Sequence, residues 1–273
     1  MAGETIRSEA ICLDIRPWSK TSHVVSWLTP VGKVTTVAKG AERPKSYFLG
    51  QYDLNYTCDI LYYAGAKGEV HALRDCVPVA RRDDLRSDYR ALALAGYFRR
   101  LVAELAPTGE ECGAWYEELK RSLDSCASLT SGRETASTLT SGRETASTLT
   151  SGRETASTLP GGRETASTIL LSRMLGFELR ILKLSGLAPD FSGYDRNAEW
   201  SAFSVETGTF GVAEGRCIRV SREVAEYLAN GAQNAKNPQT PLDAARVIGV
   251  FYHFHLDCAS DVRRTVLGMI AQK

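Results

Sequence analysis

The sequence lacks the features that mark membrane-spanning, secreted and disulfide-stabilised proteins. No apolar run approaches the roughly 18 residues that a membrane-spanning helix needs. The start, "MAGETIRSEA", has no basic region followed by an apolar one, so we expect no secretory signal. The seven cysteines are odd in number and never spaced as CxxC, a pattern that favours reduced thiols over disulfides or a thiolate metal site. We therefore expect a cytoplasmic protein without a membrane segment.

The sequence also lacks a large net charge and recognisable catalytic motifs. The formal net charge is only +1, so an electrostatic partner must be sought in local clusters. No GxGxxG or GxSxG is present, and "PVGKVTT" lacks the first glycine and the Ser/Thr of a phosphate-binding P-loop. His253 and His255 are two residues apart, whereas a helical zinc site needs a spacing of four. The sequence predicts no catalytic residue, no metal and no cofactor.

The first 80 residues have the pattern of a small β-barrel. "AICLDIR" alternates apolar and polar residues, and "SHVVSWLT" and "KVTTVA" flank a turn that contains Pro30 and Gly32. "YDLNYTCDILYYA" and "EVHALRD" supply two further strands. Five short strands with glycine turns are typical of an OB-fold, which we predict over residues 1–80.

Helical patterns dominate the remainder of the chain. In "DDLRSDYRALALAGYFRRLVAELA" the residues Leu94, Phe98 and Leu101 recur on one helical face. We predict an α+β multidomain protein in which the barrel is followed by an α-helical domain. The helical domain would span residues 81–129 and 169–273, with an irregular, turn-rich loop at 190–217.

A decapeptide repeat interrupts the helical region. "TSGRETASTL" occurs three times from Thr130 to Leu159, and "PGGRETASTI" follows to Ile169. A ten-residue period rotates each leucine by roughly 80° from the previous one on a helix, so no apolar stripe forms. We predict a flexible low-complexity insert over 130–168 with no chemistry of its own.

Positive charge is concentrated within the predicted barrel. Between Ile15 and Gly50, six cations face the single acid Glu42, and aromatic residues lie among them. Cationic grooves with rings on which bases stack are how OB-folds bind single strands. The alternative is that the rings belong to the barrel core and the cations to a solvated rim. The cations are Arg16, Lys20, Lys33, Lys39, Arg43 and Lys45, and the rings are Trp18, Trp27, Tyr47, Phe48 and Tyr52.

Three segments resemble the bacterial recombination mediator family RecO. They are "EAICLDIRPWSKTSHVVSWLT", "LTPVGKVTTVAKGAERPKS" and "GFELRILKLSGLAPDF", and the resemblance covers roughly residues 8–128 and 169–190. It implies a non-catalytic protein with an OB-fold and a helical domain that binds single- and double-stranded DNA and anneals complementary strands. It also implies contact with the tail of the single-stranded DNA-binding protein SSB. With the partner RecR, such a protein helps to load RecA on SSB-coated DNA.

The resemblance also implies positions for DNA binding. Lys39, Arg43 and Lys45 match basic positions of the family, with Lys33 next, and "DVRRTVL" is loosely similar to a basic helical stretch. We therefore expect nucleic-acid contacts from the six barrel cations and from Arg263 and Arg264. Many members carry two CxxC pairs after a Pro-Asp step, but "PDFSGYDRNAEW" has none, so we expect a degenerate, zinc-free loop.

A partner groove and two other functions remain open. The apolar segments 169–185 and 242–256 could border a groove for the acidic, apolar-ended SSB tail, with Arg173, Arg180 and Arg246 at its edge. One alternative function is a nucleic-acid-processing enzyme whose OB-fold grips the substrate. Another is a protein-binding scaffold that does not bind DNA.

Overall fold

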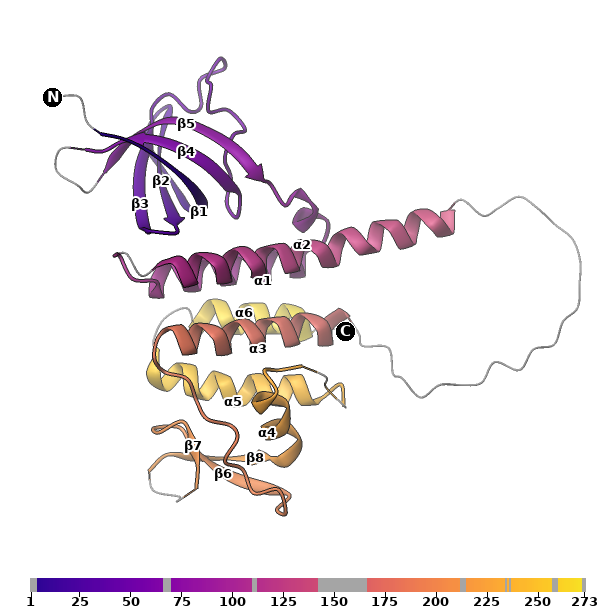
Figure 1. Ribbon diagram of the computed structural model, residues 1–273. Helices are drawn as coiled ribbons and strands as arrows, with labels where there is room; N and C mark the ends of the chain where they lie inside the picture. Colours follow the sequence, from indigo (N-terminus) through magenta and orange to yellow (C-terminus); the bar gives the residue numbers. More distant parts are fainter. Residues whose placement is uncertain are drawn as a thin grey trace, which may run out of the picture.

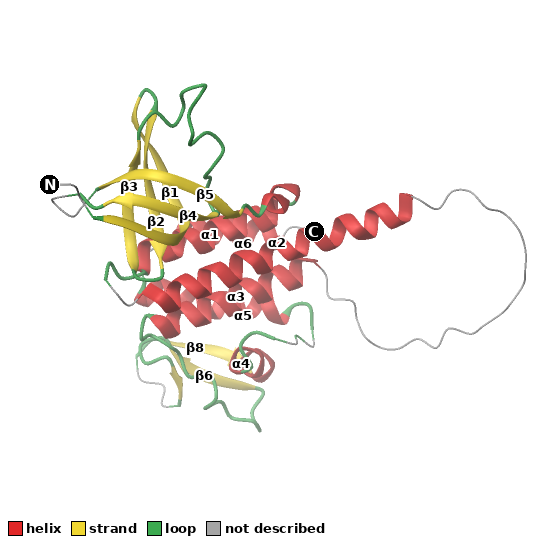
Figure 2. Cartoon of the chain, turned by 45° about the horizontal axis from the view of Figure 1, so that its top comes forward, coloured by secondary structure: helices red, strands yellow, loops and turns green. Residues whose placement is uncertain are grey.

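The computed structural model places a closed barrel at one end of the molecule and a small sheet at the other, with helices between them (Figures 1 and 2). It describes residues 4–65, 70–109, 112–141, 166–211, 215–233, 235, 237–256 and 260–271. The predicted OB-type barrel followed by a helical domain is confirmed. The barrel strands are β1 (Thr5–Ser19), β2 (Ser22–Thr29), β3 (Gly32–Ala38), β4 (Thr57–Tyr63) and β5 (His71–Ala80).

The barrel closes in the order β1-β2-β3-β5-β4. Its only parallel pairing among the described strands joins β3 to β5 through two residue pairs, Thr36 with His71 and Val37 with Ala72. Trp27 is fully buried inside, and its indole N–H donates to the Thr36 hydroxyl at 2.9 Å. A buried indole needs such a partner, so this bond fixes the ring in the barrel core.

The helical domain begins later than the sequence pattern predicts. Residues Asp83–Ser87 form a 3₁₀ turn, and the first α-helix follows after Asp88, whose extended backbone stops a continuous helix. The Asp88 carboxylate accepts a hydrogen bond from the Arg90 N–H at 2.9 Å and caps the helix. The helices are α1 (Tyr89–Leu105), α2 (Gly113–Ser141), α3 (Ala166–Leu184), α4 (Arg222–Ala229), α5 (Thr240–His255) and α6 (Ser260–Ala271).

Helices extend into the decapeptide repeat from both sides. Helix α2 continues to Ser141, past the predicted start of the insert at residue 130, and α3 begins at Ala166. The buried stripe of α2 nucleates the helix, which then extends because adding a residue to a formed helix is much easier than starting one. The end of α2 projects beyond the other helices (Figure 1). The rest of the predicted flexible insert, 142–165, lies outside the described residues.

The predicted irregular loop, 190–217, contains two strands of a three-stranded sheet and the first residue of the third, so this region is more regular than the sequence predicts. Phe203 is fully buried, and its ring centroid lies 5.0 Å from that of Phe191 and 5.2 Å from that of Phe210. The ring of Phe203 also lies 6.2 Å from that of Phe251 on the following helix α5, so this aromatic cluster packs the short strands onto the core of the helical domain. The strands, in the order β7-β6-β8, are β6 (Trp200–Ser204), β7 (Thr209–Phe210) and β8 (Cys217–Ser221).

A buried ion pair crosses the centre of the helical domain. Glu178 on α3 is fully buried and accepts two hydrogen bonds from Arg263 on α6, at 2.8 and 3.0 Å. The Tyr97 hydroxyl on α1 donates to the same carboxylate at 2.7 Å. These bonds compensate the cost of burying both charges. Among the described helices, none is long and apolar enough to cross a membrane.

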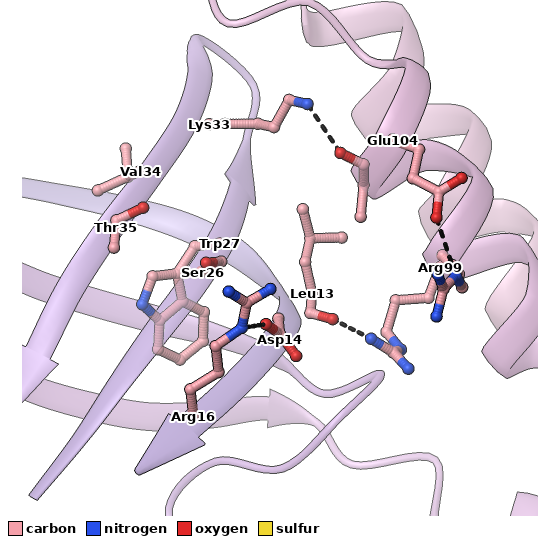
Figure 3. Close-up of a pocket in the computed structure, with 12 residues that line it drawn as sticks. Leu13, Asp14, Arg16, Ser26, Trp27, Lys33, Val34, Thr35, Arg99 and Glu104 are labelled. Carbon is pink, nitrogen blue, oxygen red and sulfur yellow. Dashed lines mark hydrogen bonds and ion pairs between the residues drawn. The ribbon is translucent and has the colours of Figure 1, made fainter. Parts of the chain in front are cut away.

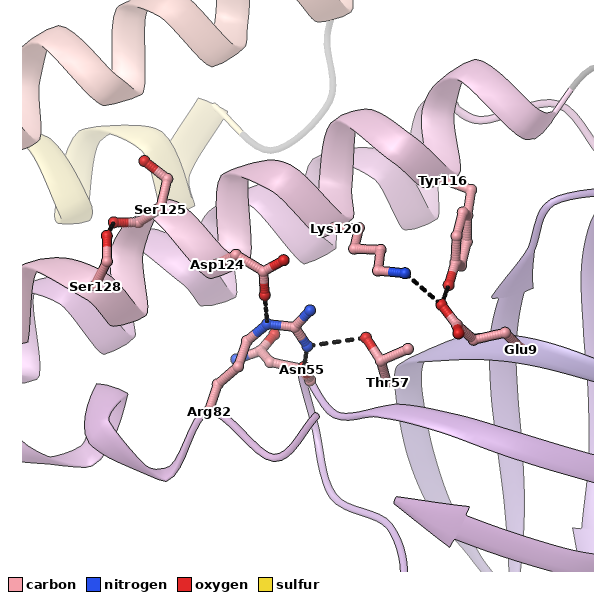
Figure 4. Close-up of polar contacts among 9 residues, drawn as sticks. All are labelled: Glu9, Asn55, Thr57, Arg82, Tyr116, Lys120, Asp124, Ser125 and Ser128. Carbon is pink, nitrogen blue, oxygen red and sulfur yellow. Dashed lines mark hydrogen bonds and ion pairs between the residues drawn. The ribbon is translucent and has the colours of Figure 1, made fainter. Parts of the chain in front are cut away.

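Polar contacts fasten the barrel to α2 (Figure 4). Glu9 on β1 accepts hydrogen bonds from the Tyr116 hydroxyl and, at 2.5 Å, from the Lys120 ammonium. Arg82, whose side chain is only 3% exposed, pairs with Asp124 at 2.7 Å. The same guanidinium donates to the Asn55 carbonyl oxygen and the Thr57 hydroxyl, at 2.7 and 3.0 Å, which ties the end of the barrel to the helix.

The Glu9 contacts predict an acid-sensitive junction. The Lys120 and Tyr116 hydrogen bonds lower the pKa of Glu9 below its ordinary value of 4.5. The folded carboxyl therefore binds a proton less readily than the unfolded one, and its stabilising effect is present above pH 4.5 and is lost as pH falls through the folded pKa. Glu9→Gln should lower the free energy of unfolding at pH 7, and the difference from the wild type should shrink towards pH 3.

Urea unfolding at several pH values between 7 and 3 measures this difference. Glu4→Gln is the control, because Glu4 is exposed and forms no ion pair within the described part of the chain. A Glu9→Gln deficit that stays constant down to pH 3 would contradict the assignment.

Candidate nucleic-acid interface

The basic loop after β3 is held against the β1–β2 hairpin. Gly40 has a φ of +69°, in the left-handed region that glycine adopts without strain. This turn lets the Gly40 N–H donate to the Ser22 hydroxyl at 3.1 Å and the Glu42 N–H donate to the Thr21 carbonyl oxygen at 3.1 Å. The loop and the hairpin therefore form one continuous end of the barrel.

Four of the predicted cations gather at this end, and we call them the rim cluster. All four are exposed, and none forms an ion pair among the described residues. The neighbouring acid, Glu42, has its Oε1 atom 2.8 Å from Nε2 of His23. Positive charge thus predominates at this end of the barrel. The rim cluster consists of Lys20 on the hairpin and Lys39, Arg43 and Lys45 on the loop.

The aromatic residues divide into core and surface groups. Trp27 is buried, whereas Phe48 and Tyr52 pack against the barrel core and are partly buried. Trp18 and Tyr47 are 66% and 63% exposed, next to the hairpin and on the basic loop. These two rings are available for stacking on bases. Three of the five rings therefore serve the core and two face solvent.

Lys33 does not belong to the rim cluster, which corrects the prediction. It lies on the β2–β3 hairpin side of the barrel, and its ammonium donates to the Ala103 carbonyl oxygen at 2.9 Å. That carbonyl belongs to the last turn of α1, where carbonyl groups lack partners within the helix. Burial lowers the pKa of Lys33. The residue fastens the barrel to α1.

Arg16 lies on β1, between the rim cluster and the helical domain. Its side chain is 79% exposed, and Nε lies 2.5 Å from the Asp14 carboxylate. Figure 3 shows Arg16 and Lys33 reaching from the barrel and Arg99 reaching from α1 around one cleft. Arg99 and Arg100 were not among the cations predicted from the sequence. The pair "RR" in "YFRRLV" is the signal that could have drawn attention to them.

The two arginines near the C-terminus have opposite environments. Arg263 is buried in the ion pair with Glu178, so the prediction that it contacts DNA is wrong. Its withdrawal from that pair would leave the Glu178 carboxylate buried and uncompensated. Arg264 is 82% exposed and lies 3.7 Å from Asp261 on the same helix, α6, away from the rim cluster. The structure does not bring either residue to the barrel.

The three arginines predicted for partner binding lie in two different clefts. Arg173 and Arg180 line a cleft of about 370 Å³ beside α3, where Arg173 donates to the Ser125 carbonyl oxygen and Arg180 pairs with Glu118 at 2.6 Å. Arg246 lies elsewhere, in a cleft of about 390 Å³ between α5 and α6. That second cleft is also lined by Arg216, Arg264, His253, Val250, Tyr252 and Leu267.

The described residues contain no group of three or more His, Cys, Asp or Glu side chains that could hold a metal ion. Cys217 lies on β8. His255 on α5 has Nε2 2.8 Å from the Val205 carbonyl oxygen, so this imidazole is used in packing the small sheet against the helix.

The fold and the interface place this protein in one structural class. It has an OB-type barrel, whose end carries exposed cations and aromatic rings, joined to a helical domain. No family model matches the chain. Over 120 residues it is 29% identical to the DNA repair protein RecO of Alkaliphilus metalliredigens (strain QYMF). The match covers 43% of this chain and 48% of that protein, so the chain spans about half the length of the curated relative it matches. Over the matched residues the chain is similar to RecO.

The position of Arg43 predicts a selective effect of Gly40→Ala. A Cβ at Gly40 would lie 3.2 Å from Cδ and 3.3 Å from Nε of Arg43, whereas a Cβ at Gly50 would meet nothing within 4 Å. Both glycines have left-handed backbones, at φ +69° and +72°, so each alanine should cost about 1 kcal/mol of stability. Only Gly40→Ala should also weaken binding to single-stranded DNA, because it displaces Arg43.

Fluorescence anisotropy with a labelled single-stranded oligonucleotide, beside thermal unfolding, measures both effects. Equal losses of affinity in Gly40→Ala and Gly50→Ala would show that backbone strain, and not the placement of Arg43, controls binding.

Proposed function

We propose that this protein is a non-catalytic DNA-binding mediator of recombinational repair, of the RecF-pathway type. The observation that carries the proposal is the rim cluster, four exposed cations without ion-pair partners among the described residues, beside the exposed rings of Trp18 and Tyr47. The RecO-like sequence supports the same class.

The chemistry of the rim cluster suits a sugar-phosphate chain better than a single small anion. Lysine and arginine side chains that neutralise phosphates release counterions from the nucleic acid, which favours binding. Exposed aromatic rings add about 1–3 kcal/mol per stacked base and tolerate any base. Phosphate neutralisation and base stacking do not depend on the identity of the base, so we expect binding to single- and double-stranded DNA with little sequence preference.

Strand annealing requires no reaction chemistry in this proposal. A strand whose phosphates are neutralised repels a second strand less, so base pairing between complementary strands becomes easier. The buried acids of the helical domain support a structural role for that domain, because Glu178 and Glu118 are both used in ion pairs with arginines. The alternative, an enzyme that processes nucleic acid, predicts turnover of a polynucleotide or nucleotide substrate.

The proposal includes protein partners of the same pathway. The cleft between α5 and α6 combines Arg246 and Arg264 with the apolar side chains of Val250, Tyr252 and Leu267. An acidic peptide with an apolar end, such as the SSB tail, suits this combination. RecR as partner, the loading of RecA on SSB-coated DNA, and a cytoplasmic, nucleoid-associated location complete the proposed role.

The double variant Lys39→Ala/Arg43→Ala tests the proposal. It should weaken binding to single-stranded DNA for every base composition and lower the slope of log K against log[salt] by about 0.7 for each lost phosphate contact. Annealing of complementary oligonucleotides should slow in parallel. The control is Arg7→Ala/Arg74→Ala, which removes the same charge from β1 and β5, where these arginines contact Asp59 and Tyr63.

A salt titration by filter binding gives the slope directly. If the rim variant keeps the wild-type slope, or if the control loses as much, the rim cluster is not the DNA site. Nucleotide or polynucleotide turnover by the wild-type protein would favour the enzyme alternative.

A further inference from the structure

A cleft of about 380 Å³ lies where the barrel meets α1, and nothing in the preceding proposal uses it. Its volume falls in the range of roughly 300–1,000 Å³ typical of ligand sites. Strands β1, β2 and β3 form one wall and α1 forms the other (Figure 3). Four cations and two acids line this junction cleft: Arg16, Lys33, Arg99 and Arg100, with Asp14 and Glu104.

Positive charge in the junction cleft is incompletely compensated. Arg99 donates one hydrogen bond, to the Leu13 carbonyl oxygen, and its Nε atom is buried without a hydrogen-bond partner among the described residues. A buried N–H without an acceptor is destabilising, so the site gains stability from any acceptor that reaches it. Burial also lowers the pKa of Arg99, although an arginine keeps its charge at neutral pH.

The acids of the cleft do not block an incoming anion. Asp14 pairs with Arg16 at 2.5 Å and Glu104 pairs with Arg100 at 2.8 Å, but the two arginine side chains are 79% and 57% exposed. Each of these ion pairs uses the Nε–H of the arginine, and a guanidinium carries five N–H donors. The remaining N–H groups of both arginines can therefore bind a phosphate.

Strand β1 connects the junction cleft to the rim cluster. Arg16 and Lys20 are four residues apart, at the end of β1 and in the following turn, with a bulge of the strand between Pro17 and Ser19. Trp18 lies between them and is 66% exposed. Cations at both ends with a ring between them form a path along which a single strand can continue from the rim cluster.

We infer that the junction cleft is a second phosphate subsite, and that a single strand bound at the rim cluster continues along β1 so that its backbone enters the cleft between Arg16 and Arg100. This inference rests on the proposed DNA-binding function and extends it. The helical domain thereby contributes directly to strand binding through α1. The minimum length of a tightly bound oligonucleotide is set by the distance from the rim cluster to the cleft.

The test compares charge-removing variants on oligothymidylates of about 4 and about 12 nucleotides. Arg16→Gln/Arg100→Gln should lower the salt slope on the long oligonucleotide by about 1.4, for two lost phosphate contacts, and leave binding of the short one nearly unchanged. Both arginines are exposed, so folding should be preserved, which thermal unfolding checks. Arg7→Gln/Arg74→Gln is the charge-matched control and should keep the wild-type slope on both lengths.

A second variant tests the cleft without removing any ion pair. Thr35, on the barrel wall of the cleft, is half-buried, and Thr35→Glu places a carboxylate where the phosphate would lie. It should reduce affinity for the long oligonucleotide at least tenfold and leave the short one within about twofold.

The outcomes separate this inference from the function on which it rests. If the Arg16/Arg100 and Thr35 variants bind both lengths like the wild type while Lys39→Ala/Arg43→Ala is impaired, the second subsite is wrong and the proposed function stands. If the rim variant also binds like the wild type, the proposed function falls as well.

Discussion

Two hydrogen bonds donated by backbone N–H groups hold the rim cluster together. They join the loop after β3 to the β1–β2 hairpin, through the N–H groups of Gly40 and Glu42. They extend the pairing of β3 with β2, which reaches Ala38 and His23, so the loop cations and the hairpin lysine lie on one continuous end of the barrel. With them, four cations are held at one end of a closed sheet, and each rests on backbone whose position is already determined. Such preorganisation matters because a chain that must first order its side chains and loops loses part of the binding free energy.

The molecule uses its cations in two distinct ways. Arg82, Arg263 and Lys33 are directed inward, towards carboxylates or carbonyl oxygens that hold the barrel and the helices together. The rim cluster is directed outward and has no ion-pair partner in the part of the chain that the structure describes. Cations that point into the molecule stabilise the fold. Exposed cations without neighbouring acids favour the binding of a polyanion. A net charge of +1 hides this division, because the acids that balance the total lie mostly elsewhere.

The sequence predicts the barrel well because alternation and glycine turns are local signals, and the excess of cations in its first half marked the rim cluster. The sequence could not show whether a given side chain points into the core or towards solvent. Arg263 and Arg264 are neighbours on a helix, separated by about 100° around its axis, so one enters the core and the other faces solvent. Lys33 and Lys39 both belong to the cation-rich stretch of the sequence, but they lie at opposite ends of β3. The sheet β6–β8 was missed because its strands are short and because Phe203 packs against Phe251, which follows much later in the chain.

Protection of lysines from acetylation in the presence of DNA tests the central claim most directly, since it measures which side chains a bound strand covers. The wild-type protein is labelled with a brief pulse of acetylating reagent, with and without a saturating single-stranded oligonucleotide, and modification is quantified by mass spectrometry. The account predicts that Lys20, Lys39 and Lys45 become protected together, while Lys183, exposed on α3, reacts equally in both states. Unchanged labelling of the three barrel lysines at saturation would contradict it.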